Sequence, residues 1–111
     1  MIYANYLAHA EKSKLALLEE AAGWADAWRR EAPKDANAHY LHAYSLGRYS
    51  QGISFAKALA QGYGGRIKEA LTTALKLEPK HADAHIAYVS YQAEIIEKVG
   101  SLVGGIAHEL N

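Results

Sequence analysis

The sequence predicts an all-α protein of five or six antiparallel helices. Apolar residues recur at three- and four-residue intervals along most of the chain, which is the period of one helix face. No useful stretch alternates apolar and polar residues as a half-buried strand does. Pro33 and Pro79, the only prolines, each follow a helical run and precede an alanine-rich one. Because proline cannot continue a helix interior, both are expected to mark helix ends.

The composition describes one soluble globular domain, residues 1–111, with enough length for one core. Half of the residues are hydrophobic, and 12 Lys and Arg balance 12 Asp and Glu. A nucleic-acid binder usually carries a basic excess, so no nucleic-acid partner is expected, nor is a polybasic membrane anchor. The lack of cysteine excludes disulfides, thiolate zinc sites and a cysteine nucleophile.

No apolar stretch approaches the 18 residues of a membrane span, and the start "MIYANYLAHAEKSK" lacks the pattern of a secretory signal. We therefore expect no membrane partner and a cytoplasmic location. The chain begins and ends inside helix-like sequence. It could thus be a fragment of a longer repeat protein, in which case a periplasmic location is the alternative.

In the first third of the chain, we expect a helix at about 3–12 and a second at about 14–31, capped by Ser13. Gly23 is expected to let another helix approach closely. Two apolar stripes follow helical spacing there. They are Leu15, Leu18, Ala22 and Ala25, and Leu17, Ala21, Trp24 and Trp28.

Asp35 is a good N-cap for a helix from about 36 to 60, with a kink or break near 47–53. "GYGG", residues 62–65, is predicted to be a loop. A helix at about 65–77 follows, and it buries Ile67, Ala70, Leu71, Ala74 and Leu75. The next helix, at about 82–98, has Ile86, Val89, Ala93 and Ile96 at helical spacing, and the glycine-containing tail forms a final, weaker helix.

The two proline turns are predicted to belong to an internal repeat. "APKDANAH", residues 32–39, and "EPKHADAH", residues 78–85, align at an offset of 46. Each copy is a helix, a proline-centred turn and a helix that begins "A-x-A-H". The identical pairs are Pro33/Pro79, Lys34/Lys80, Ala36/Ala82, Ala38/Ala84 and His39/His85.

The junction "ALTTALKLEPKHADAH" resembles the boundary between two tetratricopeptide (TPR) repeats. The offset of 46 exceeds the usual repeat of about 34 residues, and His39 and His85 stand where the family has a large aromatic residue. The resemblance therefore implies a divergent, lengthened TPR-like stack. Roughly residues 15–100 also resemble a bacterial TPR-like family of unassigned function. They resemble more faintly the TPR-like proteins that accompany TRAP transporters and the regulator-of-microtubule-dynamics proteins.

The TPR-like resemblance implies a non-enzymatic scaffold that binds a peptide or a partner helix in a groove. The residues that it would place there are Asn37, Tyr40, Tyr44, Arg48, Asp83, Ser90 and Glu94. The alternative is an accessory protein that holds a small molecule or lipid in an apolar cavity near residues 50–63. The same segment could instead pack closely through Gly52, Ala56 and Ala60. The apolar ends predict self-association through a terminal helix or a longer parent protein.

The sequence gives only weak indications of a metal site, an anion site or an enzymatic activity. His81 and His85 are the weak candidates for a metal site, but they lack an obvious third ligand, so no metal and no cofactor is expected. The helix start after "GYGG" could attract an anion, but the phosphate-loop motif is lacking, which favours a flexible loop. No nucleophile motif is present, so we expect no enzymatic activity.

Overall fold

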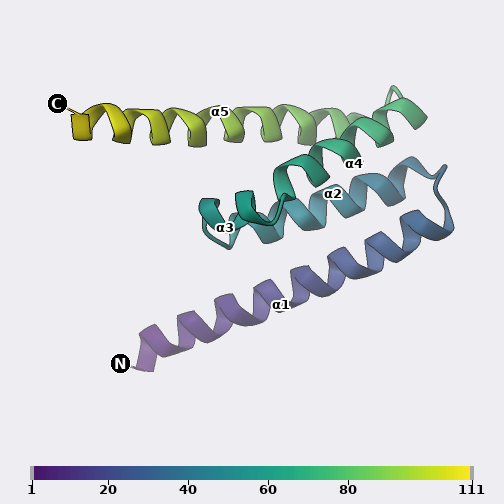
Figure 1. Cartoon of the computed structure of the whole chain (residues 1–111). Helices are drawn as coiled ribbons and strands as arrows, with labels where there is room; N and C mark the ends of the chain where they lie inside the picture. Colours follow the sequence, from purple (N-terminus) through teal and green to yellow (C-terminus); the bar gives the residue numbers. More distant parts are fainter. Residues whose placement is uncertain (1, 111) are drawn as a thin grey trace.

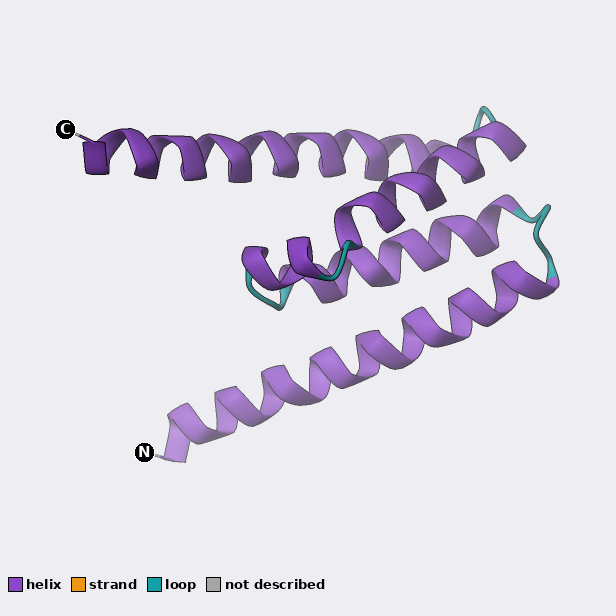
Figure 2. Ribbon diagram, in the orientation of Figure 1, coloured by secondary structure: helices purple, strands orange, loops and turns teal. Residues whose placement is uncertain are grey.

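The computed structural model describes the backbone of residues 2–110 and the side chains of residues 4–105. Within this range the chain forms five helices and no strand, so the all-α prediction is confirmed (Figures 1 and 2). None of these helices has the length and apolar character needed to cross a bilayer. The helices are α1 (Ile2–Glu31), α2 (Ala36–Gln51), α3 (Phe55–Ala60), α4 (Tyr63–Leu77) and α5 (Ala82–Leu110).

The two proline turns place an N-cap at equivalent positions. Before α2, the backbone N–H of Asn37 donates to Oδ1 of Asp35 over 3.0 Å, which confirms the predicted cap. Before α5, the backbone N–H of Ala84 donates to Nδ1 of His81, also over 3.0 Å. Residues 35 and 81 differ by the repeat offset of 46. An aspartate therefore caps the helix in the first copy and a histidine caps it in the second.

Two predicted features of the first third are wrong. Residues 2–31 form one helix, so no helix begins after Ser13. The reason is that neither proline nor glycine occurs before Gly23 to interrupt the backbone. No other helix packs closely against Gly23, because a Cβ added there would meet no atom within 4 Å.

The middle of the chain breaks where predicted. α2 ends at Gln51 with Gly52 as its C-cap, and Ser54 is the N-cap of α3, where its side chain accepts a hydrogen bond from the backbone N–H of Lys57 at 3.1 Å. The predicted loop at 62–65 is shorter than expected. Gly62 has a φ of 69°, a left-handed conformation that favours glycine, and α4 begins at the next residue. The predicted tail helix is wrong as a separate element, because α5 runs on through Gly100 to Leu110.

The helices pack in the order α1, α2, α4 and α5 (Figure 1). α2 lies between α1 and α4, and α5 packs mainly on α4. The core is built of small residues, and Leu71 is its largest wholly buried side chain, 1% exposed. The predicted buried face of α4 is confirmed, with Leu75 only half-buried. The main cluster joins Ala22, Ala43, Leu46, Ile67, Ala70 and Leu71.

Both outer helices leave an apolar stripe uncovered. On α1, Ala22 and Ala25 are buried, whereas Leu17 and Trp24 of the second stripe point outward, with Trp24 69% exposed. On α5, the stripe of Ile86, Val89, Ala93 and Ile96 faces away from the core, and Ile96 is 72% exposed. Ala84, Ala87, Tyr88 and Tyr91 make the inner face instead.

Candidate binding groove

An open cleft of about 540 Å³ lies between α2 and α5, and we call it the α2/α5 groove. α4 forms its floor with Ile67 and Leu71, and α3 closes one end with Phe55 and Leu59. The groove is open to solvent, because Leu59 and other lining side chains are more than half exposed. Further lining residues are Tyr40, Tyr44, Arg48, Ser50, Gln51, Ile53, Tyr63, Asp83, Ile86, Ala87, Ser90, Tyr91, Glu94, Ile95 and Lys98.

Six of the seven expected groove residues line this one cleft. α2 contributes three of them and α5 the other three. They are Tyr40, Tyr44, Arg48, Asp83, Ser90 and Glu94. The seventh, Asn37, lies outside the groove, where its Oδ1 accepts a hydrogen bond of 2.8 Å from Nε2 of His81. Asn37 therefore links α2 to the start of α5.

The segment 50–63 lines the same groove through Ile53, Phe55 and Leu59. The expected peptide groove and the expected cavity near residues 50–63 are therefore one cleft. Gly52 is packed closely, because a Cβ there would collide with Cδ2 of Leu15. Ala56 and Ala60 are exposed, so the expected close packing through these two residues is wrong.

Tyrosines form the apolar walls of the groove. The rings of Tyr40 and Tyr44 lie 6.1 Å apart. Burial, followed by the Asp83 carboxylate and Tyr44, raises the pKa of the Tyr40 hydroxyl. Burial, followed by Tyr88, raises the pKa of the Tyr91 hydroxyl. Both hydroxyls stay protonated at neutral pH, so each can donate a hydrogen bond to a ligand.

The two ends of the groove differ in charge. Asp83 lies at one end and Lys98 at the other, fifteen residues later on α5, which is about 22 Å along a helix. Arg48 and Glu94 line the Lys98 end, and Nε2 of Gln51 donates to Oε2 of Glu94 over 3.3 Å. One end is thus acidic, and the other has an excess of one positive charge.

Six lining residues with large side chains belong to neither expected set: Ile67, Leu71, Ile86, Tyr91, Ile95 and Lys98. On α5 the signal was present, because residues 83, 87, 90, 94 and 98 recur at helical spacing. On α4, the four-residue spacing of Ile67 and Leu71 predicted a shared buried face. That this face forms the floor of a groove depends on how α2, α4 and α5 pack together, which spacing within one helix does not fix.

Three histidines form hydrogen bonds with neighbouring backbone or side-chain groups: His39, His81 and His85. Nε2 of His85 lies 2.6 Å from the Pro79 carbonyl oxygen, and His81 is engaged by Ala84 and Asn37. In the part of the chain whose side chains are described, no cluster of three or more potential ligands could hold a metal ion.

Comparison of the chain with protein-family models, with curated proteins and with solved structures finds no match. The α2/α5 groove is therefore the main indication of function in this chain.

Proposed function

We propose that the chain is a non-enzymatic, TPR-like interaction module whose α2/α5 groove binds a segment of a partner protein. The observation that carries this proposal is the convergence of six expected groove residues on one open, apolar cleft. Such a cleft suits a peptide or an amphipathic helix, which lays its apolar side chains along the floor while polar groups at the rim fix its register.

The TPR-like part of the proposal is supported by the recurrence of turn geometry at the offset of 46. Asp35 and His81 cap their helices through side-chain acceptors. Ala38 and Ala84, one residue before each repeated histidine, are both 0% exposed. Small residues at these positions let successive helices approach closely.

The groove favours an occupant with a defined order of side chains. Apolar side chains would pack against Ile67 and Leu71, and hydrogen-bond acceptors would meet the hydroxyls of Tyr40 and Tyr91. The end charges favour a basic residue beside Asp83 and an acidic one toward Arg48 and Lys98. A segment with the reverse charge order would place like charges together at both ends.

The non-enzymatic part of the proposal is supported by the lining. Among the described residues, no histidine lines the groove, and Oγ of Ser50 already donates to the carbonyl oxygen of Gly47 over 2.8 Å. A serine nucleophile in this cleft would therefore lack an adjacent imidazole base.

Peptide selection tests this function. A library of random peptides displayed on phage is selected on the wild-type protein and then on two tryptophan variants of α5. Ser90→Trp places an indole inside the groove, whereas Gln92→Trp adds the same ring to an exposed position outside it. We expect selected peptides to bind wild type and Gln92→Trp equally and to lose at least tenfold in affinity for Ser90→Trp. Equal binding to all three proteins, or no enrichment at all, would overturn the proposal.

A small apolar molecule is the second candidate, and the volume of the groove favours it. The 540 Å³ lies within the roughly 300–1,000 Å³ of small-molecule sites. Native mass spectrometry of the gently purified protein separates the two candidates. A retained mass of a few hundred daltons that disappears in Ser90→Trp and persists in Gln92→Trp would assign the groove to a small ligand.

A further inference from the structure

A second, smaller pocket of about 90 Å³ lies where α1, α2 and α4 meet, and we call it the α1/α2/α4 pocket. It shares no lining residue with the α2/α5 groove. Arg29, His42, Arg66 and Thr73 line it, together with Glu69 and His39. These residues come from three helices, so the pocket is a product of the tertiary fold.

The imidazole of His42 is the central feature of this pocket. His42 is 4% exposed, yet neither ring nitrogen has a hydrogen-bond partner among the described residues. Oδ1 of Asp26 lies 3.7 Å from Nε2, which is beyond hydrogen-bond distance. The Nε–H of Arg29 is also buried without a partner. Unpaired buried polar groups are destabilising, so these atoms call for a ligand or water.

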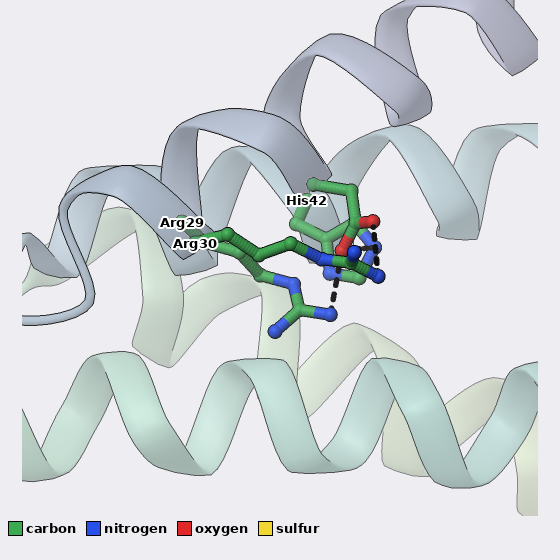
Figure 3. Close-up of polar contacts among 4 residues, drawn as sticks. Arg29, Arg30 and His42 are labelled. Carbon is green, nitrogen blue, oxygen red and sulfur yellow. Dashed lines mark ion pairs between the residues drawn. The ribbon is translucent and has the colours of Figure 1, made fainter.

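The acid nearest to His42 is already engaged. The Asp26 carboxylate holds Arg29 at 2.5 Å and Arg30 at 3.0 Å (Figure 3). Its Oδ1 pairs with Arg29 by distance but makes no hydrogen bond among the described residues, and it lies too far from Nε2 of His42 to accept one from the ring. No described residue is a hydrogen-bond partner of His42, so a partner would have to enter the pocket as a water or a ligand.

Positive charge is in excess around the pocket. Arg29, Arg30 and Arg66 oppose only Asp26 and Glu69, and no described carboxylate oxygen lies within 4.0 Å of the Arg66 nitrogens. The Arg66 guanidinium instead lies over the Tyr63 ring, 5.3 Å from its centroid. Water could satisfy the hydrogen bonds of His42, but only an anion would also neutralise this excess.

We propose that the α1/α2/α4 pocket binds a phosphate-type oxyanion between Arg29 and Arg66, with His42 and the Thr73 hydroxyl as hydrogen-bonding partners. A volume of 90 Å³ is about that of three waters in the liquid, which suits one tetrahedral oxyanion. A hydrogen phosphate both accepts from the guanidinium groups and exchanges a hydrogen bond with a neutral imidazole. Sulfate can only accept, so the pocket should prefer phosphate over sulfate.

The test is a titration of ¹⁵N-labelled full-length protein with inorganic phosphate, followed by NMR at pH 7 and constant ionic strength. Sulfate and chloride are titrated in parallel. We expect saturable shifts at Arg29, His42, Arg66 and Thr73 with phosphate in the millimolar range, and at least threefold weaker binding of sulfate. Shifts that never saturate, or that are the same for all three anions, would overturn the proposal.

Two substitutions on α4 assign the effect to the pocket. Arg66→Gln and Lys68→Gln each remove one positive charge from an exposed position of the same helix, but only Arg66 lines the pocket. We expect Arg66→Gln to weaken phosphate binding at least tenfold and Lys68→Gln to change it less than twofold. Thr73→Val, which keeps the side-chain shape, should weaken it about threefold. Equal weakening by Arg66→Gln and Lys68→Gln would mean only diffuse electrostatic attraction and would overturn the site.

The source of the phosphate is distinguished by a second titrant. If O-phosphoserine binds at least tenfold more tightly than inorganic phosphate, the pocket binds a phosphate group that is part of a larger ligand. If the two bind equally, the ligand is the free anion. Either result supports the proposed phosphate site, whereas binding of neither titrant would overturn it.

Discussion

The Nε2 atom of His85 lies 2.6 Å from the carbonyl oxygen of Pro79, and the same atom of His39 lies 2.8 Å from the carbonyl oxygen of Pro33. A carbonyl only accepts, so Nε2 carries the proton in both rings. Each histidine therefore ties the first turn of its helix to the residue six positions earlier. The repeat in sequence is thus also a repeat in hydrogen bonding.

The two copies should differ in how much this bond stabilises the fold. His39 is buried, whereas His85 is exposed. We expect His39→Phe, which keeps a ring but removes the donor, to lower the free energy of unfolding by about 1–2 kcal/mol. His85→Phe should change it by less than about 0.5 kcal/mol. Urea unfolding followed by circular dichroism measures both, and equal losses would show that burial does not set the strength of the bond.

Features that depend on a few neighbouring residues could be predicted from the sequence. The cap at Asp35 and the break after Gly52 arise from local backbone chemistry, and both occur where expected. The predicted start after Ser13 failed for the same reason. A capping side chain marks the start of a helix only where the residues before it are not helical. Ser13 has helical residues on both sides, because neither proline nor glycine precedes Gly23 in α1.

Features that depend on how helices meet were harder to predict. Helical spacing groups Ile86 with Ile96, but it does not fix which way that face turns, and here Ile96 points outward while Ile86 lines the α2/α5 groove. Six of the seven expected groove residues share one cleft, because three lie on one face of α2 and three on one face of α5. The environment of His42 had no sequence signal, because Asp26, His42 and Arg66 come from three helices.

Two glycines should respond in opposite directions to an added methyl group. Gly23→Ala fills open space within α1, so we expect it to raise the free energy of unfolding by about 0.5–1 kcal/mol. Gly52→Ala would drive a Cβ into Leu15 and should be destabilising. Leu15→Ala should reduce the cost of Gly52→Ala if that contact is its cause. Urea unfolding of the single and double variants measures this coupling, and strict additivity would contradict it.

The protein should become less stable as the pH falls below about 6.5, because His42 binds a proton more readily in the unfolded chain than in the folded one. Burial, followed by the Arg29 guanidinium, lowers the pKa of His42 below its ordinary value of 6.5, while Asp26 opposes the shift. Arg66 and His39 lower the pKa further. The unfolded chain then binds a proton more readily than the folded one. The free energy of unfolding should therefore decrease as pH falls from 6.5 to the folded pKa, by at most about 1.4 kcal/mol per pH unit.

NMR titration of the His42 ring measures this pKa directly in the folded protein. We expect a midpoint below 6.5 in chloride, and a higher midpoint when phosphate occupies the α1/α2/α4 pocket, because an anion favours the charged imidazole. A midpoint at or above 6.5 in chloride would contradict the prediction.

The outer stripe of α5 should bind the same stripe of a second copy. Val89, Ala93 and Ile96, which do not line the α2/α5 groove, continue at the same spacing through Gly100 and Val103, over about 21 Å of helix. All five positions are exposed and none is charged. The α1 stripe is less suited to pairing, because the indole N–H of Trp24 donates to the Glu20 carboxylate over 3.5 Å, which places a charge beside it.

Sedimentation equilibrium of two glutamate variants tests this pairing. Ile96→Glu and Leu17→Glu each replace one aliphatic side chain, 72% and 66% exposed, on opposite sides of the stack. We expect the wild type and Leu17→Glu to sediment as dimers and Ile96→Glu as a monomer, because pairing would bury the new charge without a partner. A monomeric wild type, or loss of the dimer only in Leu17→Glu, would show that the α5 stripe is not the contact between copies.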